Sequence, residues 1–112
     1  MRRSGIIAAF AIVLAGQPVA ALEYKGQEAA ALRCANMLAM TGVALGSTGK
    51  IPEVEQKVIL GMSVLILDRH VSGTWSQKKA ALRVVRGRRT ALETFTEFKK
   101  YAGKCLEQFP IN

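Results

Sequence analysis

Cys34 and Cys105 are the residues with the clearest chemistry in this chain of 112 residues. Both fall on apolar sides of expected helices, and catalytic dithiols usually have a Cys-x-x-Cys spacing that is absent here. Thiols of exported proteins are commonly oxidised, and the first residues of this chain indicate export. We therefore predict a structural disulfide between Cys34 and Cys105, worth about 4 kcal/mol because it closes a long loop. An intermolecular bond is the alternative.

The other reactive side chains do not form a recognisable catalytic site. His70 is the only histidine and Asp68 the only aspartate, and positions two apart do not face each other on a helix. A zinc site needs three or four ligands, more than one histidine and two oxidised cysteines supply. The glycine-rich segment 46–50 lacks the earlier glycine and the following Ser or Thr of a phosphate-binding loop. We predict no enzymatic activity, catalytic residue, metal site or cofactor.

A run of basic residues is the strongest feature of the expected surface. It comprises Lys78, Lys79, Arg83, Arg86, Arg88 and Arg89. Residues 79, 83 and 86 share one helical face, which predicts a positive stripe. Such a stripe can bind phosphates or anionic lipid head groups, each cation contributing about 1 kcal/mol near a charged surface. The alternative is a solvated face without a dedicated partner.

The charge of the whole chain points to the same partners. The formal net charge is +8 at pH 7, and the chain stays clearly basic without Arg2 and Arg3. A positive balance attracts anionic surfaces and acidic proteins. We expect an anionic envelope surface or an acidic protein as the partner, and no nucleic acid, because export removes the protein from the cytoplasm.

Residues 1–21 are typical of a secretory signal peptide. Arg2 and Arg3 precede an apolar run from Ile6 to Ala15, which is followed by Gly16-Gln17-Pro18 and by small residues. The run is too short to span a membrane, and Gln17 stands where a lipoprotein needs a cysteine. We predict cleavage between Ala21 and Leu22, a mature domain of residues 22–112 without a transmembrane anchor, and a periplasmic or secreted location.

The elements that must position these residues are all expected to be helices. Apolar residues recur three and four apart throughout the mature chain, and no segment alternates as a strand does. The first helix should span about residues 24–44, ending near Gly42, Gly46 and Gly49, with Ala31, Cys34, Leu38, Thr41 and Leu45 on its apolar side. The second should span about 52–71. Its segment 58–67 is apolar on almost every side, which predicts the central buried helix.

The remaining helical stretch runs from Trp75 to about Gln108. Thr74 and Gln77 fit a capping box at its start, and Gly87 among four arginines predicts a break. The residues expected to face inward are Trp75, Leu82 and Val85 before the break and Leu92, Phe95, Phe98, Ala102, Cys105 and Phe109 after it. The predicted fold is a small all-α bundle of three helices, or of four if the break is real, with one disulfide.

Together these features predict a non-enzymatic binding or interaction protein that uses a basic helical face. In size, leader, helicity and single disulfide the chain resembles small periplasmic acid-stress chaperones, although in architecture only. That resemblance implies the alternative function of holding unfolded clients on apolar surface uncovered in acid. The chain has only eight Asp and Glu, fewer than such a mechanism favours.

Overall fold

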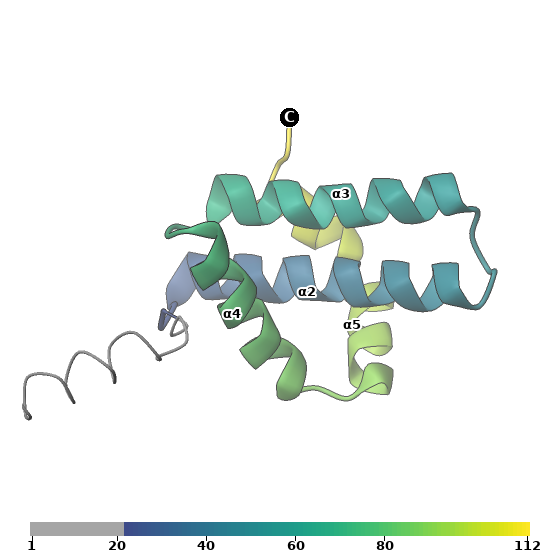
Figure 1. Ribbon diagram of the computed structural model, residues 1–112, viewed down its shortest axis with the longest axis horizontal. Helices are drawn as coiled ribbons and strands as arrows, with labels where there is room; N and C mark the ends of the chain where they lie inside the picture. The colour runs from purple at the N-terminus through teal and green to yellow at the C-terminus, as the bar shows by residue number, and fades with distance from the viewer. Residues whose placement is uncertain (1–21) are drawn as a thin grey trace, which may run out of the picture.

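Four α-helices account for most of residues 22–112, the part of the chain that this computed structural model describes (Figure 1). They are α2 (Gly26–Ser47), α3 (Glu53–His70), α4 (Trp75–Gly87) and α5 (Ala91–Gln108). This part of the chain contains no strand, so the predicted all-α class is confirmed and the number of helices is four. The predicted signal peptide, residues 1–21, lies outside the described residues.

Helix α2 is the centre of the fold. It contacts each of the other three helices; α3 runs alongside it, whereas α4 crosses it obliquely and extends away from it (Figure 1). Its buried residues are Ala31, Leu32, Cys34, Ala35, Asn36, Met37, Leu38, Thr41 and Gly42. The five consecutive buried residues 34–38 cover more than one turn, so α2 is enclosed on all sides there. The apolar side predicted for this helix is confirmed from Ala31 to Thr41.

The prediction that the second helix is the central one was wrong. Only Ser63, Ile66 and Leu67 of α3 are buried, while Val58 is 57% exposed and Val64 is 46% exposed. The physical reason is that α3 packs chiefly on α2, which covers a single side of it. An apolar pattern identifies a helix that can be buried, but it does not say how many neighbours that helix has.

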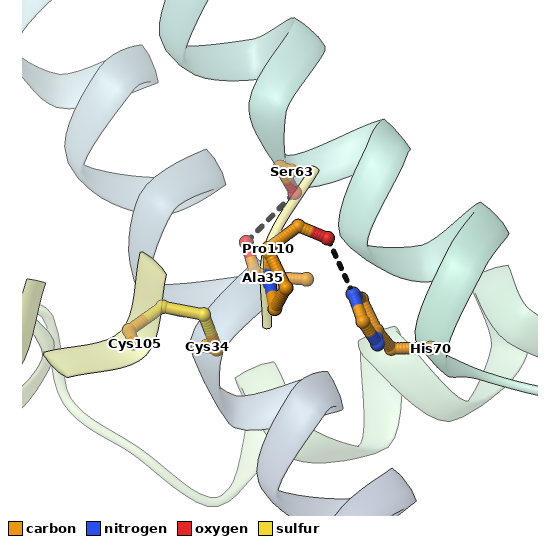
Figure 2. Close-up of a disulfide and its surroundings, with 6 residues drawn as sticks. All are labelled: Cys34, Ala35, Ser63, His70, Cys105 and Pro110. Atoms are coloured by element: carbon orange, nitrogen blue, oxygen red, sulfur yellow. Dashed lines mark hydrogen bonds between the residues drawn. A yellow bond between two sulfur atoms is a disulfide. The ribbon is translucent and has the colours of Figure 1, made fainter. Parts of the chain in front are cut away.

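Close contact between α2 and α3 depends on small side chains. The Ser63 hydroxyl donates a hydrogen bond of 2.8 Å to the Ala35 carbonyl oxygen (Figure 2). A Cβ atom on Gly42 would lie 3.0 Å from Cγ2 of Ile59, so glycine permits this approach. The expectation that Gly42 and Gly46 end the helix was wrong, since α2 continues to Ser47. The turn falls at Gly49, whose φ is +70°.

The predicted break in the last helical stretch is confirmed. Helix α4 ends at Gly87 and α5 begins at Ala91. The predicted capping box is present at the start of α4, where the Thr74 hydroxyl accepts from the Gln77 N–H and the Gln77 side chain accepts from the Thr74 N–H. Thr90 and Glu93 form a second capping box at the start of α5. Each box satisfies backbone donors that a helix start leaves free.

Two residues expected to face inward are exposed instead. Trp75 is 44% exposed and Leu92 is 77% exposed. Trp75 directly follows the capping Thr74 and Leu92 lies two residues after the capping Thr90, so both are in the first turn of their helices. Periodicity places them on an apolar side, but the angle at which each helix leaves its cap decides whether they reach the core.

The disulfide between Cys34 and Cys105 is confirmed, and Figure 2 shows it joining α2 to the last turns of α5. The two Cα atoms are 5.6 Å apart, within the usual range for a disulfide. Both cysteines are buried, together with Phe109 just beyond α5. The bond thus fixes α5 to the central helix across 71 residues of sequence.

Helix α2 is also the one helix of the described region that is long and apolar enough to cross a membrane, judged by length and composition alone. In this structure 56% of its most apolar window is buried inside the protein. Contacts with three helices and a disulfide to α5 account for that burial, as for the core helix of a small bundle.

Candidate anion-binding face

The exposed side of α4 carries a row of cations. Trp75, Lys79, Arg83 and Arg86 follow one another at intervals of four, four and three residues, which keeps them on one side of the helix. All four are exposed, and α4 contains no Asp or Glu. We call Trp75, Lys79, Arg83 and Arg86 the basic face. Arg88, exposed at the C-cap of α4, continues the positive charge into the turn that follows.

Two of the predicted binding residues are placed elsewhere. Lys78 is only 8% exposed, since its position on α4 is turned toward the interior. Arg89 forms an ion pair with Glu97 of α5, with 2.6 Å between Nη1 and Oε1. The charge of Arg89 is thus paired within the fold, and Lys78 is turned away from the surface. Within residues 22–112, none of Lys79, Arg83, Arg86 and Arg88 has an ion-pair partner.

A hollow of about 320 Å³ lies on the side of α4 opposite to the basic face, between α2, α4 and the segment that precedes α2. Its apolar lining consists of Leu22, Ala29, Leu32, Ala81, Val84 and Val85. Its charged lining consists of Arg33 of α2, Arg88, Arg89 and one acidic residue, Glu23. The volume is at the lower end of the range of about 300–1,000 Å³ that is usual for small-molecule sites. An apolar hollow with cationic residues can accommodate the apolar part of an anionic amphiphile.

Arg33 is the residue of this region that the sequence analysis missed. It lies on a different helix from the basic run, and nothing in its local sequence marks it. It lines both the first hollow and a second one of about 330 Å³ beside the disulfide. The second hollow also includes Tyr101 and Lys104 of α5. Arg33 therefore lies between two apolar hollows, a position that only the packing of α4 and α5 on α2 creates.

Hydrogen bonds connect the start of α2 and the segment before it, which lines the first hollow, to the turn between α3 and α4. The Tyr24 hydroxyl donates a hydrogen bond of 2.6 Å to the Ser72 carbonyl oxygen. The Ser72 N–H donates one of 2.6 Å to Oε2 of Glu28. Hydrogen bonds from the Ser72 hydroxyl and then its N–H, followed by the charge of Lys78, lower the pKa of Glu28. Burial, and then the Glu28 charge, raise the pKa of Tyr24.

His70 makes contacts that hold the fold together. Its Nε2 lies 2.7 Å from the Pro110 carbonyl oxygen, which can only accept, so this nitrogen carries the proton (Figure 2). The ring also packs edge-on against Phe109, with centroids 5.4 Å apart. The residues that the structure describes contain no cluster of three or more His, Cys, Asp or Glu side chains that could hold a metal ion. His70 joins the end of α3 to the C-terminal tail.

Comparison of this chain with models of known protein families, with curated proteins and with solved structures gives no match.

Proposed function

We propose that this protein is an exported, non-enzymatic helical protein that binds anionic membrane surfaces through the basic face of α4. The observation that carries the proposal is the row of exposed cations Lys79, Arg83 and Arg86 on a helix without a carboxylate. Each cation held near an anionic membrane contributes about 1 kcal/mol, so three on one side are enough for weak, salt-sensitive binding.

Trp75 favours a lipid surface over a soluble polyanion. Its ring is 44% exposed on the same side as the cations, and indole rings settle at the boundary between lipid head groups and acyl chains. A partner that offers charge alone would leave this ring unused.

The proposed export has support from the oxidation state of the fold. Disulfides persist in oxidising compartments, and this one joins two buried positions of the core. An apolar segment preceded by Arg2 and Arg3 at the start of the chain fits the same destination. We place the protein in the periplasm or outside the cell, where it meets phosphate-bearing surfaces of the envelope.

Co-sedimentation with vesicles tests the proposed function. The wild-type protein should sediment with vesicles of phosphatidylglycerol and phosphatidylcholine and remain in solution with phosphatidylcholine alone. Changing Lys79, Arg83 and Arg86 to Gln should weaken binding at least tenfold, since about 1 kcal/mol is removed with each charge. Binding should also weaken as salt is raised.

A charge-matched variant provides the control. Lys50, Lys99 and Lys100 are exposed cations outside α4, and changing them to Gln removes the same net charge. This control should bind almost as tightly as the wild type. Equal loss of binding in the two triple variants would show that net charge alone is responsible. Undiminished binding of the α4 variant would remove the proposal.

A further inference from the structure

The outward side of α3 carries an uncovered apolar stripe. Val54, Val58, Gly61 and Leu65 recur at intervals of four, three and four residues, which places them on one side of the helix. Val54 is 71% exposed and Val58 is 57% exposed, while Leu65 is partly buried. We call these four residues the α3 stripe. It lies opposite the side that carries the buried residues Ser63, Ile66 and Leu67.

The spacing and the small central residue suit another helix as the occupant. Intervals of three and four residues form the seam along which two α-helices pack. A Cβ atom placed on Gly61 would have no protein atom within 4 Å, so the centre of the stripe is open to close approach. Within the described part of the chain, α3 packs chiefly on α2, and its outer side is left without a helical neighbour.

The charges beside the stripe identify what kind of helix fits. The next position in the same spacing is Asp68, so two parallel copies of α3 would bring two Asp68 carboxylates face to face. Two antiparallel copies centred on Gly61 would instead bring Asp68 of one copy beside Val54 of the other, one turn from Lys57, which forms an exposed ion pair with Glu53 of its own helix. The negative charge then meets a positive one.

The opposite edge of the stripe is complementary in the same arrangement. Glu55 and Arg69 are exposed on that edge, near the two ends of α3. With the copies antiparallel, Glu55 of each lies within one turn of Arg69 of the other. Two-fold symmetry repeats every contact, so four opposite-charge pairs surround an apolar seam.

We propose that the α3 stripe binds a second copy of this chain, forming an antiparallel two-fold dimer centred on Gly61. The stripe lies opposite the residues that α3 buries, and α3 packs chiefly on α2. Figure 1 shows α4 extending away from α2 on the side opposite α3. The dimer therefore leaves the basic face free, and this inference does not depend on the proposed function.

The mass in solution, measured by sedimentation equilibrium, tests the dimer. The wild-type protein should have twice the chain mass, and Val58→Glu should have the mass of one chain with unchanged helical circular dichroism. Val84→Glu introduces the same charge on α4 at a residue that is 43% exposed, and it should remain dimeric. A wild-type protein that stays monomeric at its highest soluble concentration, or two variants with equal masses, would overturn the proposal.

Cysteine cross-linking gives an independent result should Val58→Glu fail to fold. Gly61→Cys places one thiol from each copy at the centre of the proposed seam, and mild oxidation should yield a covalent dimer. Val58→Cys should not cross-link to itself, because its antiparallel neighbour is Val64. Efficient self-linking of Val58→Cys would indicate a parallel pair, and absence of a covalent dimer from Gly61→Cys would exclude the seam altogether.

Discussion

The disulfide is the residue-scale feature on which the stability of this small fold depends most. Cys34 and Cys105 connect helices whose separation in sequence is 71 residues, and a loop of that length corresponds to about 4 kcal/mol of lost chain entropy in the unfolded state. Domains of this size are commonly stable by only about 5–15 kcal/mol. The disulfide therefore contributes a large part of the free energy of unfolding.

We expect Cys34→Ala, Cys105→Ala and the double variant to be destabilised by similar amounts, about 4 kcal/mol. The shared magnitude follows because any of the three opens the same loop. Urea denaturation, with the wild type measured in the presence and absence of reductant, checks this. A reduced wild-type protein as stable as the oxidised one would contradict the role assigned to the bond.

Glu28 gives the fold a defined response to acid. Its pKa is lowered in the folded state, so its contribution to stability is present above the ordinary value of 4.5 and is lost as the pH falls through the lowered value. Hydrogen bonds from Thr90, first from its N–H and then from its hydroxyl, lower the pKa of Glu93 in the same direction.

We therefore predict that Glu28→Gln makes the free energy of unfolding less dependent on pH below 4.5. The variant lacks the carboxylate that Ser72 stabilises, so lowering the pH no longer removes the stabilisation that this charged group provides. Chemical denaturation at neutral pH and at pH values below 4.5 measures the effect, with the exposed Glu107→Gln as the charge-matched control. Identical pH profiles for Glu28→Gln and the wild type would show that the Ser72 contacts do not form in solution.

At the residue scale, the sequence could identify the run of cations but not which of them are exposed and without an ion-pair partner in the fold. Lys78 and Lys79 are adjacent and chemically equal, yet one is buried and the other exposed because the helix turns by about 100° between them. Arg89 has its partner on the next helix, and Arg33 reaches the same region from α2. Those relations depend on how the helices pack.

At the scale of elements, the two capping boxes define where α4 and α5 start. Thr74-x-x-Gln77 was recognised in the sequence, and Thr90-x-x-Glu93 has the same pattern, although the sequence analysis did not use it. Together with Gly87, that second box predicts the break without further information. The boundary of α2 was harder to predict because Gly42 serves helix packing and does not end the helix.

Leu92 and Phe109 test how the ends of the α5 region are packed. Both belong to the apolar set predicted from sequence, but Leu92 is 77% exposed and Phe109 is 4% exposed. We expect Leu92→Ala to change the free energy of unfolding by less than about 0.5 kcal/mol and Phe109→Ala to reduce it by about 3–5 kcal/mol. Thermal and urea denaturation check the pair. Comparable losses would mean that the start of α5 is packed against the core in solution.

At the scale of the whole molecule, the apolar and basic surfaces face in different directions. Figure 1 shows α3 and α4 on either side of α2, so the α3 stripe and the basic face do not compete for one partner. The sequence showed both an apolar second helix and a basic third one, but their placement around α2 could not be predicted. Which helix becomes central depends on contacts between segments far apart in the chain, and a single helix's pattern does not contain them.

This arrangement predicts that the proposed dimer links membranes. A two-fold dimer through α3 presents two basic faces away from its centre, so it should cluster phosphatidylglycerol vesicles as well as bind them. Val58→Glu should still bind these vesicles but raise their light scattering much less. Equal clustering by Val58→Glu and by the wild-type protein would show that vesicle clustering does not depend on the α3 stripe.

The most direct test of the central claim uses Trp75, the only tryptophan in the chain. If the basic face binds anionic membranes, adding phosphatidylglycerol vesicles should shift the Trp75 emission to shorter wavelength and shield it from an aqueous quencher. The variant with Lys79, Arg83 and Arg86 changed to Gln should require at least tenfold more lipid, and phosphatidylcholine alone should have no effect. If the wild-type protein binds the vesicles but the Trp75 emission is unchanged and still fully quenched, the protein binds through another surface. That result would contradict the claim that the basic face binds membranes.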